Sequence, residues 1–217
     1  EALNDKEVIG RKMKCNEAKN LICESPRRKE NAMAKALMAL ARGFEDIEAV
    51  TIIDVLRRGG VEVVTASIHN SLEVPSAHGV VLKADARFED VAGGEFDAIV
   101  LPGGGEGTEN LKNSDALIRR LQRQNEEERW LCAICAAPTV LVEAGVVRDG
   151  LHMTCYPTCQ LELDRPWSPV PVVVDGNVIT GQAPGSALLF ALVVLQTLTD
   201  KRNAQRVARG MVTDLLD

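Results

Sequence analysis

Hydrophobic residues recur in two spacings along the chain, and together they predict strands that alternate with helices from residue 34 onwards. Short apolar runs rich in β-branched residues, bounded by glycine or charged residues, are typical of buried strands. The runs expected to be strands are residues 34–43, 61–67, 79–85, 96–105, 130–134 and 151–157. Residues 170–180 hold two further β-branched runs on either side of Asp175-Gly176-Asn177, which predicts a hairpin.

Longer segments with apolar residues about one helical turn apart predict the helices between these strands. In residues 44–60, Ile47, Val50 and Ile53 lie close to this spacing, with acids at the start and arginines before a final glycine pair. The other segments expected to be helical are 114–127, 137–145, 184–199 and 201–216. Strands alternating with helices predict an α/β fold, in which helices cover both faces of a mostly parallel sheet.

The first 33 residues differ from the rest, because they are polar, carry both signs of charge and contain no clear strand. We therefore divide the chain into an irregular or helical N-terminal extension, residues 1–33, and an α/β domain, residues 34–217.

Composition narrows the class of protein. The chain has 217 residues, 46% of them hydrophobic and 26% charged, which is ordinary for a globular protein with a substantial core. Its net charge of −6 argues against nucleic acid or an anionic membrane as a partner. No stretch of 18 uncharged apolar residues and no signal peptide are visible. With six cysteines read as reduced thiols, we expect a cytoplasmic protein.

Three polar or glycine-rich features fall where predicted strands end: residues 43–48, residues 102–105 and Cys135. Ligands of doubly wound sheets bind at the carboxyl ends of the strands. Cys135 follows an apolar strand and precedes Ala136-Ala137-Pro138, which is the arrangement of a nucleophile elbow with cysteine in place of serine. We expect the helix that follows to favour its thiolate, the reactive form.

Two further features lie beside this thiol in the predicted sheet. The backbone N–H groups of Gly103 and Gly104 could hold an oxyanion, and a carboxyl group at Glu48, early in the first helix, could tune the pKa of the thiol. The glycines match neither the phosphate-binding P-loop nor the dinucleotide-binding pattern, so we expect no cofactor. Pro184, at another predicted strand end, is a candidate to line the same pocket.

Four stretches together resemble the ThiJ/PfpI family, also called the DJ-one superfamily: ARGFEDIEAVTIIDVLRRGG, FDAIVLPGGG, CAICAAP and DGNVITGQAPGSALLFAL. They keep the family's order and spacing and cover most of the chain from about residue 34. The resemblance implies a flavodoxin-like three-layer sandwich, similar to class I glutamine amidotransferases, and a homodimer. It also implies that Cys135 is the reactive cysteine, that Glu48 is its carboxylic partner, and that Gly104 and Ala136 are backbone donors to an oxyanion.

One position departs from the pattern of several family members, which place a histidine before a proline near the thiol. Tyr156 stands there in this chain, and a neutral tyrosine is a poor base because its pKa lies near 10. His152 is expected along a strand, and His69 and His78 are expected at the surface of the hairpin region. A Cys-His dyad is therefore not expected from this segment.

The remaining cysteines allow two further interpretations. Cys132, Cys135, Cys155 and Cys159 have a spacing similar to zinc sites, but the first two lie in an apolar strand without a glycine, so we expect no metal. Cys132 should share a face with Ile134 and pack into the core. Cys159 or Cys155 could instead resolve an oxidised Cys135 into a disulfide, although unrelated small residues are the simpler interpretation.

Three functions follow from these features. The first, which the resemblance implies, is a glutathione-independent glyoxalase or deglycase, in which the Cys135 thiolate attacks a 2-oxoaldehyde such as methylglyoxal and Glu48 moves protons. The second is an oxidative-stress sensor or redox-regulated chaperone that forms a Cys135 sulfinate without turnover. The third and weakest is a cysteine amidase or peptidase with a base from a partner subunit. The expected partner is a small reactive carbonyl or an oxidant.

Overall fold

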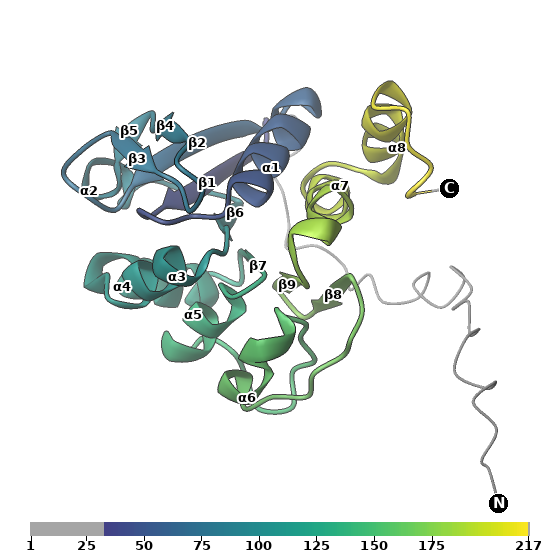
Figure 1. The fold of residues 1–217 in the computed structure, drawn as a ribbon. Helices are drawn as coiled ribbons and strands as arrows, with labels where there is room; N and C mark the ends of the chain where they lie inside the picture. Colours follow the sequence, from purple (N-terminus) through teal and green to yellow (C-terminus); the bar gives the residue numbers. More distant parts are fainter. Residues whose placement is uncertain (1–32, 217) are drawn as a thin grey trace, which may run out of the picture.

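A seven-stranded sheet forms the centre of the computed structural model, which describes residues 33–216 (Figure 1). Its strand order is β5-β2-β1-β6-β7-β9-β8, and only β8 runs antiparallel to its neighbour. The strands are β1 (Lys35–Leu40), β2 (Glu62–Ser67), β5 (Ala86–Arg87), β6 (Ala98–Leu101), β7 (Trp130–Ile134), β8 (Val172–Asp175) and β9 (Val178–Gly181). The short strands β3 (Glu73–Pro75) and β4 (Val81–Lys83) form a separate hairpin. The predicted α/β fold is confirmed.

Helices cover both faces of this sheet. One layer consists of α1 (Asp46–Arg58), α7 (Ala187–Leu198) and α8 (Lys201–Gly210), which lie together in the upper part of Figure 1. The helices on the other side are α2 (Phe88–Val91), α3 (Gly105–Lys112), α4 (Asp115–Glu126), α5 (Pro138–Glu143) and α6 (Gln160–Leu163). Within residues 33–216, no helix combines the length and the apolar character that a membrane span requires.

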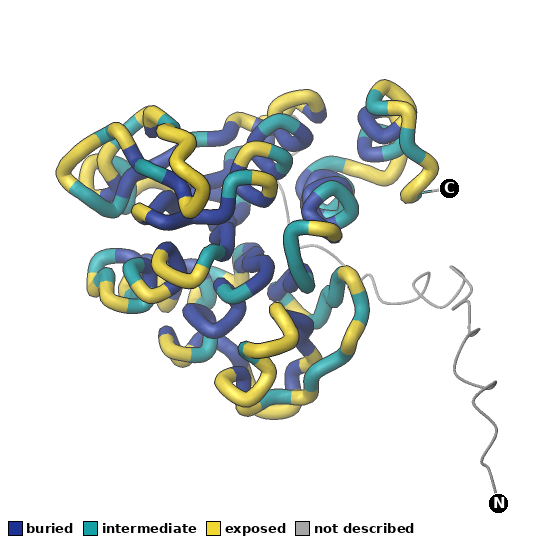
Figure 2. Tube along the Cα trace, in the orientation of Figure 1, coloured by how far each residue is buried: buried dark blue, intermediate teal, exposed yellow. Residues whose placement is uncertain are grey.

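Alternation along the strands divides the buried residues into two cores. In β1, Ala36, Met38 and Leu40 face the layer of α1 and α7, whereas Leu37 and Ala39 face the other layer. Successive side chains of a strand point to opposite faces, so a strand covered on both sides is apolar throughout. Figure 2 shows the result, with buried segments along the strands and exposed ones at the loops.

The ends of α1 follow directly from its sequence. Glu45 caps the helix by accepting a hydrogen bond from the Glu48 N–H at 2.8 Å, and acidic residues occupy the first turn. Arg57 and Arg58 lie in the last turn, where their positive charges interact favourably with the negative end of the helix dipole. The helix ends at Gly59. The first turn of α1 is thereby held at the carboxyl end of β1.

The predicted strand at residues 151–157 is wrong. Only an isolated bridge forms there, between Met153 and Trp167. The neighbouring Thr154 donates its N–H to the Thr180 hydroxyl at 3.0 Å and its own hydroxyl to the Val170 carbonyl at 2.9 Å. Backbone hydrogen bonds of Met153 to Pro166 and Ser168 complete the support, so the segment is held beside residues 166–170 and does not join the sheet.

The structure also tests the predicted hairpin at residues 170–180 and the glycine-rich strand end at residues 103–105. The hairpin at residues 170–180 is confirmed as β8 and β9. The glycines predicted to end a strand at residues 103–105 also begin a helix, because α3 starts at Gly105. The predicted extension lies outside the described residues, apart from residue 33.

Candidate functional site

Three strand ends converge at the carboxyl edge of the sheet. Cys135 directly follows β7, Gly103 and Gly104 follow the adjacent β6, and Glu48 lies in the first turn of α1, after β1. The Glu45 N–H donates to the Gly103 carbonyl at 2.9 Å, which ties the start of α1 to the loop after β6. The structure thus brings the predicted thiol, carboxyl group and glycines together.

Cys135 adopts the strained backbone of a nucleophile elbow. Its φ of 65° lies in the left-handed region, which costs a residue other than glycine about 1–3 kcal/mol. Two hydrogen bonds hold it there: the Cys135 N–H donates to the Gly181 carbonyl at 2.9 Å, and the Tyr156 N–H donates to the Cys135 carbonyl at 2.7 Å. Such strain persists where the surroundings over-determine the backbone, as is common at functional sites.

The surroundings of the Cys135 sulfur correct one prediction. The residue is only 7% exposed, and burial together with the neighbouring Glu48 raises the pKa of its thiol above the ordinary value. The backbone N–H groups of Ala136 and Gly104 face the sulfur and lower that pKa, but by less. We expected the helix after Cys135 to favour the thiolate; α5 has only six residues, and desolvation outweighs what its dipole supplies.

Glu48 is a fully buried acid with one satisfied and one unsatisfied oxygen. Its Oε2 accepts a hydrogen bond from the Gly103 N–H at 2.7 Å, and its Oε1 has no hydrogen-bond partner within residues 33–216. Burial raises the pKa of this carboxyl group to about 7, against the lowering effects of the Gly103 N–H and the Cys135 thiol. Near neutral pH the group therefore exists in both protonation states, as a general acid–base catalyst requires.

The thiol and the carboxyl group titrate as a pair. The Glu48 carboxylate raises the pKa of the Cys135 thiol, whereas the neutral thiol lowers the pKa of Glu48, so the buried site carries one charge far more readily than two. When Glu48 is protonated, the repulsion disappears and its O–H becomes a donor that stabilises an ionised sulfur. A reactive thiolate at Cys135 thus depends on a proton held by Glu48.

The glycines are required by close packing around this pair. A Cβ atom on Gly103 would lie 2.7 Å from the Cys135 Cβ and 2.9 Å from Glu48 Oε2. Gly104 has a φ of 97°, and a Cβ there would collide with the Gly43 carbonyl oxygen. Only glycine at both positions lets the backbone approach the sulfur and the carboxyl group this closely.

The other predicted pocket residues lie around the elbow. Tyr156 meets Cys135 through its backbone N–H, while the residue itself is 42% exposed. Pro184 begins the short 3₁₀ turn after β9, at the same edge of the sheet. Cys155 is buried and Cys159 is partly exposed, and neither is among the groups that shift the pKa of Cys135. Their action as resolving thiols stays a prediction.

The remaining candidate ligands are distributed as follows. Cys132 shares the α1 and α7 face with Ile134 and is completely buried, as predicted. Among residues 33–216, one group of potential metal ligands lies within 4.8 Å, consisting of Glu45, Asp46 and His78. No spacing in the sequence indicates this group, because it joins the start of α1 to the turn of the β3–β4 hairpin.

The histidines lie away from the thiol. His69 is partly exposed, and its Nε2 accepts a hydrogen bond from the Arg42 N–H at 2.9 Å. His78 is exposed, as predicted, and bonds to Asp46. The His152 N–H donates to Asp175 at the end of β8, the opposite edge of the sheet, so its predicted place in a strand is wrong.

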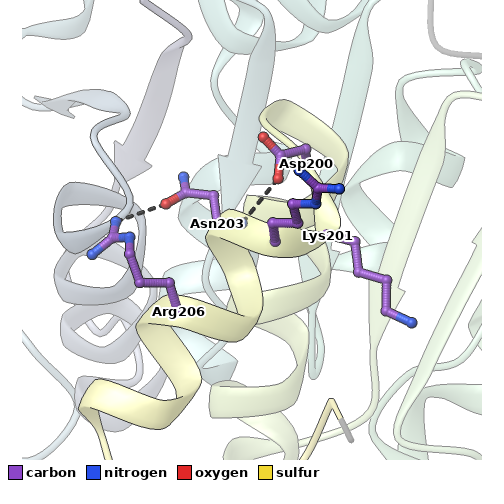
Figure 3. Close-up of a pocket in the computed structure, with 5 residues that line it drawn as sticks. Asp200, Lys201, Asn203 and Arg206 are labelled. Atoms are coloured by element: carbon purple, nitrogen blue, oxygen red, sulfur yellow. Dashed lines mark hydrogen bonds between the residues drawn. The ribbon is translucent and has the colours of Figure 1, made fainter.

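A surface hollow of about 590 Å³ lies at the start of α8 (Figure 3). Its lining residues are Asp200, Lys201, Arg202, Asn203 and Arg206. Asn203 also bonds to the Gly59 carbonyl at the far end of α1. Since the first turn of α1 carries Glu48, this hollow lies at the opposite edge of the sheet from the thiol.

The chain is similar to known proteins over most of its length. The model of the DJ-1/PfpI family matches residues 34–197. Protein DJ-1 homolog B of Arabidopsis thaliana is 36% identical over 180 residues, and the match spans 82% of this chain but 41% of that protein. Protein dj-1beta of Drosophila melanogaster is 38% identical over 180 residues, covering 82% and 96% of the two chains. A protein of Pyrococcus abyssi named as a deglycase is 32% identical over 154 residues, covering 70% and 91%.

Solved structures agree with these sequence matches. The crystal structure of Drosophila melanogaster DJ-1beta has a TM-score of 0.81 at 36% identity and covers 84% of this chain and 99% of its own. The structure of oxidized Toxoplasma gondii DJ-1 has a TM-score of 0.80 at 34% identity, covering 83% and 99%.

Replacing Glu48 with glutamine is expected to flatten the pH dependence of folding stability. Folding raises the pKa of this acid from 4.5 to about 7, so the folded state holds a proton that the unfolded state has lost. The free energy of unfolding therefore falls as the pH rises through this window, by roughly 3 kcal/mol. Urea unfolding at several pH values should show a smaller fall for Glu48→Gln. Glu126→Gln, at an exposed carboxyl group, should behave as wild type; equal slopes for all three proteins would contradict the assignment.

Proposed function

The chain belongs to the DJ-1/PfpI family, and from this membership and the pairing of Cys135 with Glu48 we propose a thiol-dependent enzyme acting on 2-oxoaldehydes such as methylglyoxal. The observation that carries the proposal is the buried Glu48 carboxyl group, with a pKa of about 7, beside the sulfur. The deglycase name of the Pyrococcus abyssi relative supports chemistry of this class. A deglycase acts on the adduct of the aldehyde with an amine or thiol and must also break the bond to that group.

The proposed reaction starts when the Cys135 sulfur attacks the aldehyde carbon of methylglyoxal. The carbonyl oxygen becomes the hydroxyl of a hemithioacetal by taking the proton that Glu48 held. The Glu48 carboxylate then removes the hydrogen from that carbon and returns a proton to the neighbouring carbon. The proton of the hemithioacetal hydroxyl passes to the former ketone oxygen, again through Glu48, which yields a thioester of lactate. Water hydrolyses the thioester to lactate and restores the thiol, so the sum is methylglyoxal plus water giving lactate.

The backbone around the sulfur suits this sequence of steps. The N–H groups of Gly104 and Ala136 face the sulfur and are placed to stabilise negative charge on an oxygen bonded to the attacked carbon. Because Tyr156 replaces the histidine of several family members, Glu48 must perform every proton transfer. Turnover is therefore expected to follow the protonation state of one carboxyl group.

Conversion of methylglyoxal to D-lactate should require both members of the pair. Glu48→Gln is expected to lose about 100-fold or more in rate, the usual contribution of a general acid–base group. Cys135→Ser should lose all activity above background, since a hydroxyl is a far weaker nucleophile. Cys132→Ala, which removes a thiol from the same strand, is the matched control and should retain activity. D-Lactate formation at equal rates in wild type and Cys135→Ser would end this proposal.

Oxidation of Cys135 without turnover is the second candidate function. The same Glu48 carboxyl group and the Gly104 and Ala136 N–H groups could hydrogen-bond the oxygens of a sulfinate. A chaperone role would then depend on this oxidised form. An amidase or peptidase has less support, because the hydrogen bonds of His69 and His78 engage them elsewhere.

Mild peroxide should add two oxygen atoms at Cys135 if the second function holds. Intact mass followed by peptide mapping would locate them, and Glu48→Gln should yield less sulfinate because it lacks the acidic O–H. Oxygen found only at other cysteines or at methionines would rule out this sensor.

A homodimer is proposed from an apolar surface that joins α1 to the β3–β4 hairpin. Hydrogen bonds from Ser76 and His78 to Asp46 hold the two elements together. The exposed large apolar side chains on them are Ile47, Val50, Val80 and Val81. Exposed apolar patches of this kind are typical of protein interfaces.

The aspartate variant Val50→Asp should convert the dimer into a monomer, because it would bury a charge in the interface. Sedimentation velocity measures the change. Leu161→Asp, at a 93% exposed leucine on α6, is the matched control and should remain dimeric. A monomeric wild type, or a dimer unaffected by Val50→Asp, would refute this surface.

A further inference from the structure

We infer that Cys155 and Cys159 form a second redox site: a thiol pair that closes to a disulfide with a low-molecular-weight disulfide as oxidant, and that slows the reaction of Cys135 when closed. This inference goes beyond the proposed function, because it assigns chemistry to two thiols that the proposed reaction does not use.

The geometry gathers both residues around one oxygen atom. The Cys155 thiol donates to the Tyr156 carbonyl at 3.2 Å, and the Cys159 N–H donates to the same carbonyl at 2.9 Å. The turn from Tyr156 to Cys159 therefore brings the backbone N–H of the second cysteine and the thiol of the first to the same carbonyl oxygen. Burial raises the pKa of the Cys155 thiol to about 12, and Cys159 is the next largest influence on it, as expected for neighbouring sulfurs.

The two thiols differ in access in the way that a stepwise exchange needs. Cys159 is partly exposed at the start of α6, whereas Cys155 is completely buried. The partly exposed Cys159 thiol can react with a disulfide from solution. The buried Cys155 thiol can then attack only the Cys159 sulfur of the mixed disulfide. Neither sulfur shifts the pKa of Cys135, which responds to Glu48 and to backbone N–H groups. Cys155 and Cys159 are therefore better placed to react with each other than with Cys135.

The exchange balances without a further reactant. The Cys159 thiol loses its proton to water and attacks one sulfur of the small disulfide, which releases one small thiolate. The Cys155 thiol then loses its proton and attacks the Cys159 sulfur, which releases the second small thiolate. Two protein thiols are oxidised to one disulfide while one small disulfide is reduced to two thiols. Since burial raises the pKa of both cysteines, the exchange is slow at neutral pH.

Tyr156 connects the pair to the reactive elbow. It lies between the two cysteines, and its N–H donates the 2.7 Å hydrogen bond to the Cys135 carbonyl. A disulfide fixes the separation of its two Cα atoms and the direction of their side chains, so closure constrains the turn that contains Tyr156. The constrained turn draws the Tyr156 N–H away from the Cys135 carbonyl, and this hydrogen bond is lost. The elbow then relaxes away from the N–H groups that favour an ionised sulfur, which slows the reaction of Cys135.

The test uses the full chain treated with oxidised glutathione. Free thiols are blocked with iodoacetamide, disulfides are then reduced and labelled with N-ethylmaleimide, and peptide mapping locates each label. We expect the second label on Cys155 and Cys159 together. The oxidised protein should then alkylate at Cys135 about fivefold more slowly than the reduced protein, the factor equivalent to one net hydrogen bond.

Cys159→Ser is the main variant, because its partly exposed site tolerates the change even if Cys155→Ser fails to fold. It should abolish the paired label and the slowing of Cys135 alkylation, whereas Cys132→Ser should preserve both. A disulfide from Cys135 to either cysteine, or no label on the pair, would overturn the inference. A closed pair with unchanged Cys135 alkylation would overturn the link to the elbow. None of these readouts involves methylglyoxal, so they stand apart from the proposed enzyme activity.

Discussion

The hydrogen bond from the Gly103 N–H to Glu48 Oε2, 2.7 Å long and fully buried, is the contact on which the site depends. It satisfies one oxygen of a carboxyl group that burial would otherwise leave without a partner, and so it makes an acid in this position tolerable. It also joins the loop after β6 to the first turn of α1. Without it, the first turn of α1 would lose a contact to the loop after β6, and the pKa of the Glu48 carboxyl group would rise further, because this N–H donor lowers it.

The elbow at Cys135 adds a second energetic cost that the rest of the fold must offset. A left-handed cysteine and a desolvated acid each lower stability, yet both lie at the ends of strands in the centre of the sheet, where β6, β7 and β9 are buried along their whole length. Hydrogen bonds from two neighbouring segments, through Gly181 and Tyr156, hold the strained residue. The site is thus rigid because strands that are covered on both sides support it.

Position along the sheet was enough to find the thiol, the glycines and the carboxyl group, because parallel strands place all their carboxyl ends at one edge. The burial that raises the pKa of the Cys135 thiol was not predictable in the same way. Ala136-Ala137-Pro138 indicates a helix start, but neither its six-residue length nor the depth at which Cys135 is buried can be inferred from local residues. The strand predicted at residues 151–157 failed for a related reason, since its backbone bonds to residues 166–168 and to Cys135, and local residues do not show which segment lies beside it.

The sequence by itself determined most of the alternation of strands with helices, the shared face of Cys132 and Ile134 in β7, and the elbow, since these depend on spacing within short segments. Tertiary structure alone decided what surrounds each group. The pKa of Glu48, the metal-ligand group at Glu45, Asp46 and His78, and the carbonyl shared by Cys155 and Cys159 all depend on segments meeting in space or on a turn closing. Desolvation and hydrogen bonding act over a few ångströms in three dimensions, and hydrophobic periodicity carries no record of which loops come that close.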